Sequence, residues 1–166
     1  MAAKTAGTWA VYEPVGIADL TVVGTTALHD LGKRCKAKDL GTTAYGFGEF
    51  IYLKGVTSTV RGSVVLVKDD FTTSLLAARD KGAVAVALAV CDANTKYGWY
   101  QIVGQGVAVA GTVSANLPLY ITAGGVTSSA TTGEQIVGMR AVSAADTNTA
   151  VVNMATYPAV CDFDNA

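Results

Sequence analysis

The feature that most constrains the fold is a repeating pattern of short apolar runs, which begins near Gly48 and continues through the rest of the chain. Residues that favour turns (Gly, Asp, Asn, Ser and Thr) separate the runs, and this spacing is typical of an all-β sandwich or barrel. We therefore expect an all-β fold, either a β-sandwich or a partly open, β-tulip-like β-barrel, with an extended N-terminal arm. The pattern predicts strands over Glu49–Leu53, Ser63–Lys68, Ala83–Val90, Gly98–Val103, Val107–Gly111, Leu117–Thr122, Gln135–Ser143 and Ala150–Thr156.

The segment Ala83–Val90 alternates strictly between alanine and a larger apolar residue. In a strand, this period of two places Val84, Val86, Leu88 and Val90 on one face and four alanines on the other. An alanine face permits close approach of a second layer. An Ala-rich helix continuing from residues 75–78 is the alternative, but Gly82 interrupts it, so the pattern favours a strand.

Residues 1–45 lack an apolar period that survives for two turns. Glycine and proline interrupt this stretch at Gly7, Pro14, Gly16, Gly24, Gly32 and Gly41. One interpretation is an extended arm that gains order on neighbouring subunits. The other is that the segment packs back as edge strands of its own domain. We expect a β-rich core domain over residues 46–160 and a short polar tail over residues 161–166.

Charge is scarce, because Asp, Glu, Lys and Arg make up 15% of the 166 residues and the net charge is −1. Proteins that bind nucleic acid electrostatically gain affinity from phosphate neutralisation, so no direct nucleic-acid partner is expected. The one basic run contains Lys33, Arg34, Lys36 and Lys38, with Asp30 and Asp39 beside it. A solvated loop is favoured there over a phosphate site.

The cysteines and the apolar runs indicate the cellular compartment in which the protein is made. Cys35, Cys91 and Cys161 are far apart and form no C-x-x-C pair, so neither a zinc site nor a disulfide framework is indicated. Residues 1–20 lack the apolar core of a secretory signal, and the longest apolar run, Ala83–Cys91, is too short to cross a membrane. We expect a soluble chain that is made in a reducing cytosol and has no membrane partner.

Residues with catalytic potential form no known constellation. His29 is the single histidine and is interpreted as a lone surface or turn residue, and G-x-S-x-G, Walker and H-E-x-x-H motifs are absent. The carboxylate pairs Asp69-Asp70 and Asp162-x-Asp164 lie at turns or in the tail, where a structural role is favoured, and a weak Ca²⁺ contact stays open. No enzyme activity, cofactor or metal site is predicted.

The large aromatic residues are the candidate anchors of either a core or an interface. Tyr97, Trp99 and Tyr100 could suggest a carbohydrate platform, but neighbouring residues of a strand point to opposite faces and cannot form one flat surface. Large aromatic side chains contribute strongly to interfaces, yet in single chains they more often fill the core. The candidate anchors are Trp9, Tyr12, Phe50, Tyr52, Trp99 and Tyr100.

The segments Gly48–Val56 (G-E-F-I-Y-L-K-G-V) and Tyr97–Gly104 (Y-G-W-Y-Q-I-V-G), the Ala-rich strand between them and Pro158–Val160 resemble the head decoration, or cement, proteins of tailed bacteriophages. The match runs in order from about Gly41 to Val160 and is less clear in the N-terminal arm. The family implies no catalytic residue, so none is carried over.

The resemblance implies a β-rich structural protein, often a homotrimer, that binds the outside of the mature icosahedral capsid and stabilises it against the packed DNA. Its partners would be the major capsid protein and further copies of itself. Its location would be the exterior of the virion, after synthesis in the cytoplasm of the bacterial host. Many copies, each with a modest contact, could strengthen the shell collectively.

Two other classes of function remain open from the sequence. One is a virion-displayed β-sandwich adhesin or carbohydrate-binding module, suggested by Trp99, Tyr100 and the polar, weakly charged composition, or a minor tail or fibre component. The other is an uncharacterised enzyme, which would require His29 or the aspartate pairs to converge in a cleft.

Overall fold

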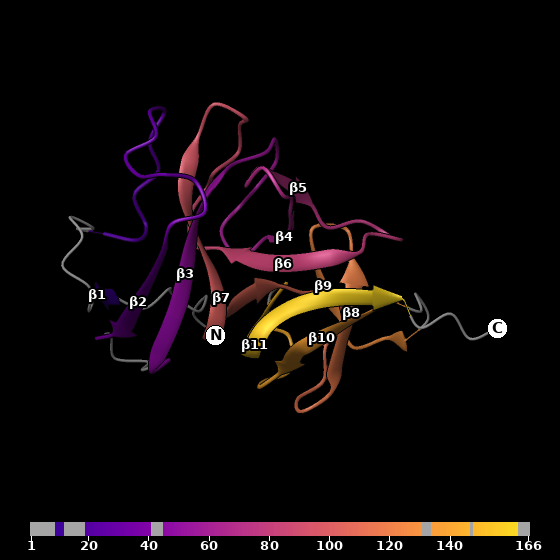
Figure 1. Cartoon of the computed structure of the whole chain (residues 1–166). Coiled ribbons are helices and arrows are strands. Elements are labelled where there is room, and N and C mark those ends of the chain that lie inside the picture. The colour runs from indigo at the N-terminus through magenta and orange to yellow at the C-terminus, as the bar shows by residue number, and fades with distance from the viewer. Residues whose placement is uncertain (1–8, 12–18, 41–44, 131–133, 147, 163–166) are drawn as a thin grey trace.

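The computed structural model describes residues 9–11, 19–40, 45–130, 134–146 and 148–162. These ranges contain no α-helix, and the predicted all-β fold class is confirmed. The strands are β1 (Trp9–Val11), β2 (Arg34–Asp39), β3 (Phe47–Lys54), β4 (Val64–Val67), β5 (Thr73–Leu75), β6 (Gly82–Ala87), β7 (Tyr97–Val109), β8 (Pro118–Thr122), β9 (Gly125–Thr127), β10 (Glu134–Ala141) and β11 (Thr149–Asp162) (Figure 1).

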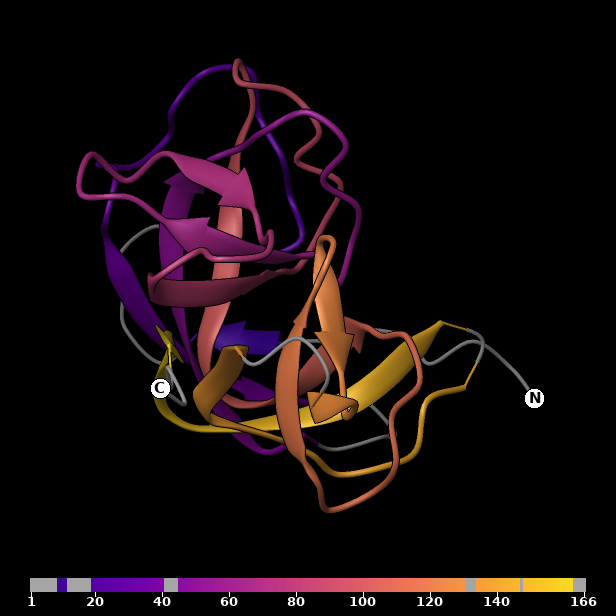
Figure 2. The same cartoon turned by 90° about the vertical axis from the view of Figure 1, so that its right-hand side faces the viewer.

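The strands form one antiparallel sheet in the order β1-β2-β3-β7-β6-β11-β10-β8-β9, with β4 beside β6 and β5 beside β4. In the described part of the chain this path does not close into a barrel, which agrees with a sandwich or a partly open barrel. Figure 1 places β1, β2 and β3 at the left and β8 to β11 at the right. We call β1 to β5 the N-terminal half-sheet and β8 to β11 the C-terminal half-sheet. In Figure 2 the yellow strand β11 runs across the lower part of the molecule.

Strand β7 belongs to both half-sheets. Its first part pairs with β3 as far as Val103, and residues Gly104 to Val109 pair with β11. The sequence pattern predicted two separate strands here, and this was wrong. Gly104-Gln105-Gly106 bends the strand without ending it, because Gly104 adopts a φ of +99°, which glycine reaches without steric cost.

The bend in β7 is held by the side chain of Gln101, which is 1% exposed. Its Nε2 donates hydrogen bonds to the carbonyl oxygens of Val103 (3.1 Å) and Gln105 (2.9 Å). A Cβ atom on Gly106 would lie 2.3 Å from Oε1 of Gln101, so the buried amide packs directly against the Gly106 backbone. A buried polar side chain therefore fixes the place where the chain passes between the half-sheets.

Both faces of strand β6 are buried, because it lies between two cores. Val84 and Val86 face the largest hydrophobic cluster, whereas Ala85 and Ala87 face a second cluster. The predicted alternation and the preference for a strand over a helix are both confirmed over Gly82–Ala87. The strand ends earlier than predicted, so Val90 lies outside it and is 48% exposed.

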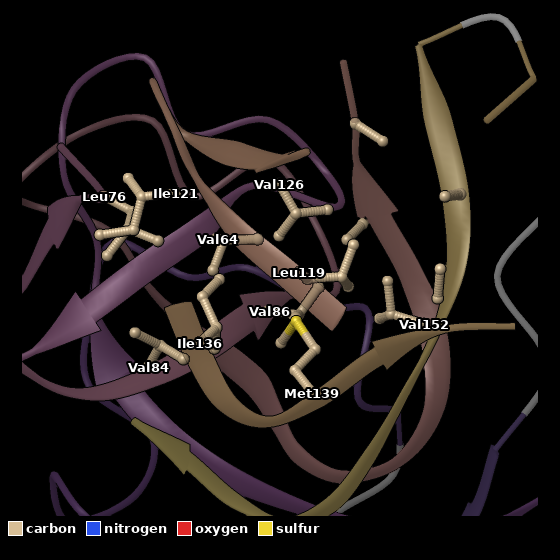
Figure 3. Packing of buried hydrophobic residues seen from close by; sticks show 14 of the residues in the cluster. Val64, Leu76, Val84, Val86, Leu119, Ile121, Val126, Ile136, Met139 and Val152 are labelled. Atoms are coloured by element: carbon tan, nitrogen blue, oxygen red, sulfur yellow. The ribbon is translucent and has the colours of Figure 1, made fainter. Parts of the chain in front are cut away.

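The largest cluster fills the space between the C-terminal half-sheet and strands β4 and β6. Figure 3 shows how these side chains point toward one another from strands that are distant in sequence. Burial of this apolar surface is the main term that stabilises the half-sheet. The residues labelled there are Val64, Leu76, Val84, Val86, Leu119, Ile121, Val126, Ile136, Met139 and Val152.

Strand β2 corrects the prediction that the basic run is a loop. Residues 34–39 alternate between exposed and buried side chains, and they pair with β3 on one side and β1 on the other. Residues 9–11 and 34–39 of the range 1–45 therefore form strands at the edge of the sheet. Whether this range also contacts a neighbouring subunit stays a prediction.

The other predicted strands correspond to β3, β4, β8, β10 and β11, with shifted ends. Strands β5 and β9 were not predicted, because each has three residues and no alternation can be read over so short a run. No helix among the described residues is long and apolar enough to span a membrane.

Candidate functional site

The two sequence motifs that carry the family resemblance lie side by side in the sheet. Strand β3 pairs with the first part of β7, with Tyr52 opposite Trp99 and Ile51 opposite Tyr100. Phe50, Tyr52 and Trp99 point to one face, and Tyr100 points to the other. The predicted opposite orientation of Trp99 and Tyr100 is confirmed.

The four candidate anchors on these strands are buried within the chain. Phe50 and Tyr100 have no exposed surface, Tyr52 is 2% exposed and Trp99 is 3% exposed. They fill cores in this chain, and Trp99 and Tyr100 present no ring surface on which a sugar could stack. For the other two anchors, Trp9 pairs through its backbone with Asp39 in the β1–β2 ladder, and Tyr12 lies outside the described residues.

The segment before β2 covers the aromatic face of β3 and β7. His29 lies against two of the rings, with its centroid 5.2 Å from that of Tyr52 and 5.4 Å from that of Trp99. The backbone N–H of Leu28 donates to the Tyr52 hydroxyl at 3.2 Å. His29 is thus a half-buried packing residue on a loop, and the prediction of a simple surface or turn histidine was incomplete.

The environment of His29 makes the stability of this face depend on pH. Burial lowers the pKa of His29 below its usual value of 6.5, nearby Lys33 lowers it further, and Asp30 opposes the shift. The unfolded chain therefore binds a proton at a higher pH than the folded chain. Stability falls as the pH drops from above 6.5 to below the folded pKa.

We expect His29→Gln to reduce this pH dependence, because glutamine cannot titrate. The measurement is the urea midpoint of both proteins at about pH 8 and about pH 5.5, on either side of the ordinary histidine pKa. His29 is the single histidine. The change in urea midpoint between the two pH values, compared between the two proteins, therefore reports on this side chain. An equal change in urea midpoint with pH in the two proteins would contradict the expectation.

The opposite face of the same strands holds Tyr100 beside Cys91. Burial raises the pKa of Tyr100, and the neighbouring Cys91 raises it further. Burial is also the main cause that raises the pKa of the Cys91 thiol. The backbone of Gly55 closes over this thiol, because a Cβ on Gly55 would lie 2.5 Å from Sγ. A buried, protonated thiol is a poor nucleophile, so this cysteine is structural.

We expect the Cys91 thiol to resist alkylation in the folded protein and to react once the chain is unfolded. The measurement is iodoacetamide labelling at about pH 8, with and without denaturant, followed by mass spectrometry of the peptide that contains Cys91. Rapid labelling of that peptide without denaturant would show that the thiol is accessible and that this assignment is wrong.

The first aspartate pair, Asp69-Asp70, lies at a turn. Asp70 caps its own turn, because its Oδ1 accepts hydrogen bonds from the Thr72 N–H (3.1 Å) and the Thr72 hydroxyl (2.7 Å). These bonds lower the pKa of Asp70. The side chains of the other pair, Asp162 and Asp164, lie outside the described residues. In the part of the chain that is described, no cluster of His, Cys, Asp and Glu could hold a metal ion.

Each cation of β2 has a neighbour within the protein. The Arg34 guanidinium lies 5.2 Å from the ring centroid of Tyr157, and Lys38 Nζ lies 5.7 Å from that of Phe47. Lys36 Nζ lies 3.4 Å from Glu49 Oε1. These contacts fit a structural role for the basic run better than a phosphate site.

Sequence reasoning missed an exposed apolar patch at the end of β2 and β3. Leu40 is 63% exposed and Phe47 is 60% exposed, and Lys38 lies over the Phe47 ring. We call these three residues the β2–β3 patch. Its signal in the sequence is weak. An exposed Leu or Phe beside a turn cannot be distinguished from a buried one in the sequence until the register of the strand is known.

Comparison of the chain with protein-family models, with curated proteins and with solved structures found no match.

Proposed function

We propose that this protein is a structural subunit that binds the outer surface of a mature phage capsid and stabilises it. The observation that carries the proposal is the direct pairing of the two resemblance motifs. Residues Glu49 to Lys54 of β3 pair in antiparallel register with residues Tyr97 to Val103 of β7. The resemblance therefore falls on one folded unit at the centre of the molecule and not on scattered surface segments.

The chemistry of the described residues supports this proposal. Phe50, Tyr52, Trp99 and Tyr100 fill cores, the Cys91 thiol is buried and protonated, and Asp70 is used in a turn. The proposal assigns no catalytic step to any of these groups. The surface of the protein would bind the capsid, and many copies, each with one modest contact, would together supply the strength of attachment.

The β2–β3 patch is the surface we assign to contact with the major capsid protein. Leu40 and Phe47 offer exposed apolar area, which is the usual centre of a contact, and Lys38 adds positive charge. Assembly into homotrimers is part of the proposal and rests on the resemblance.

The test is the copy number of this protein relative to the major capsid protein in gradient-purified phage particles, measured by quantitative mass spectrometry. Near-equal numbers would support a decoration role on the exterior of the virion. A few copies per particle would indicate a tail, collar or fibre component instead. Absence from the particles would overturn the proposal.

A further inference from the structure

An open hollow of about 360 Å³ lies on the C-terminal half-sheet, where β8 and β10 diverge. The two strands pair at Gln135↔Tyr120 and at Arg140↔Pro118, and the register shifts between these pairs. Gly138, with a φ of +84°, lies in the same interval, where the ladder from β10 to β11 also shifts. The irregular strand therefore creates the space.

Four polar side chains line this hollow: Asn116, Gln135, Arg140 and Asn153. In the described part of the chain, none of the four side chains makes a hydrogen bond or ion pair with another residue. No acidic residue is among those that line it. One cation and three amides therefore line one open space without bonding to other described residues of the protein, which leaves their donors and acceptors available to a ligand.

The elements around the hollow fix the backbone positions of these residues. Arg140 of β10 is directly opposite Asn153 of β11 on one side and Pro118 of β8 on the other. The backbone of Asn116 is fixed by a 3.0 Å hydrogen bond from its N–H to the carbonyl of Ala141. The backbone of the site is therefore in place before a ligand arrives, which limits the entropy of main-chain ordering that is lost on binding.

The chemistry of the lining selects the class of ligand. A guanidinium binds a carboxylate through two parallel hydrogen bonds, and this fork is the reason that arginine differs from lysine at such sites. A carboxamide both donates and accepts, as does a sugar hydroxyl, so three amides suit a ring with several hydroxyl groups. We propose that this hollow binds an acidic saccharide, with its carboxylate on Arg140 and its hydroxyls on Asn116, Gln135 and Asn153.

The size and openness of the hollow support a sugar unit over a larger partner. Its volume of about 360 Å³ lies near the lower end of the range of about 300–1,000 Å³ for small-molecule sites. An acidic peptide would also satisfy Arg140, and its backbone could pair with the amides, but a sugar ring places several hydroxyl groups beside one carboxylate within a single unit. The proposal does not depend on the capsid function, because it concerns the isolated chain.

The test is a titration of isotopically labelled full-length protein, followed by NMR. The probes are trigalacturonate, neutral maltotriose and triaspartate, each to about 20 mM, a range that detects millimolar binding. We expect trigalacturonate to bind and to shift the side-chain amide signals of the three lining amides. Arg140→Ala should weaken binding at least about tenfold, because it removes a charge-assisted pair.

Two control variants separate the fork from general charge. Lys68→Ala removes an exposed cation outside the hollow and should leave binding unchanged, whereas Arg140→Lys should restore only part of it. No binding of trigalacturonate, equal binding of maltotriose, or equal loss with Lys68→Ala would each overturn the proposal. Triaspartate that binds as tightly and shifts the same signals would assign the hollow to an acidic peptide instead. None of these results changes the conclusion from the copy number in phage particles, which tests the capsid proposal separately.

Discussion

Gly104→Ala is expected to lower the free energy of unfolding by on the order of 3 kcal/mol. Gly104 has a φ of +99°, and a Cβ there would lie 2.4 Å from the backbone carbonyl oxygen of Phe47. Backbone cannot move aside as a flexible side chain can. The substitution therefore adds steric overlap to an unfavourable φ, at the bend where β7 leaves β3 for β11.

Urea unfolding of Gly104→Ala and Gly111→Ala checks this expectation. Gly111 lies a few residues further along the chain, but its φ is not positive, and the nearest atom to a Cβ there is 4.0 Å away. The Gly111 variant should differ from the wild type by less than about 0.5 kcal/mol. Similar midpoints for the two variants would show that the bend in β7 tolerates a side chain.

Trp99→Ala is expected to destabilise the protein by about 3–5 kcal/mol, as large-to-small changes do at well-packed aromatic positions. Trp99 is 3% exposed and packs with Tyr52, their ring centroids 5.2 Å apart, and with His29. Removal of the indole leaves a cavity under the segment that precedes β2. The expected loss is thus one of folding, and any loss of binding by this variant would follow from it.

The measurement is again the urea midpoint, with Leu28→Ala as the matched control. Leu28 belongs to the same covering loop but is 68% exposed, so its truncation should cost little. A Trp99→Ala protein as stable as the Leu28→Ala protein would mean that the indole is not a core residue. The carbohydrate-platform interpretation of Trp99 would then regain support.

The parts of the fold that the sequence predicts well are those in which burial follows a period of two. The segment Ala83–Val90 is the clearest case, since alternation in it identified β6 before any contact was known. In β2, charged residues alternate with Cys35 and Ala37, but the small size of the buried residues hid the signal. The continuity of β7 could not be predicted, because Gly104-Gln105-Gly106 has the composition of a turn, and the hydrogen bonds of the Gln101 amide across the bend cannot be read from a local pattern.

The candidate sites were less predictable than the strands. The burial of Phe50, Tyr52, Trp99 and Tyr100 agrees with the preference for core residues, because an aromatic residue in a central strand has two packed faces available. The hollow around Arg140 was missed, because its lining residues come from separate parts of the chain and form no motif. Their convergence depends on a register shift at Gly138, and a local pattern does not specify register.

The position of β11 has a consequence for the order in which this protein folds. This strand is the last in the described chain, yet it lies in the middle of the sheet, between β6 and β10, and also pairs with β7. A nascent chain that has not yet reached Thr149 leaves the edges of β6, β7 and β10 without this partner. The C-terminal half-sheet must therefore close late, through contacts of long sequence separation, and such contacts make folding slow. During synthesis, the unpaired edges of these strands are exposed to aggregation.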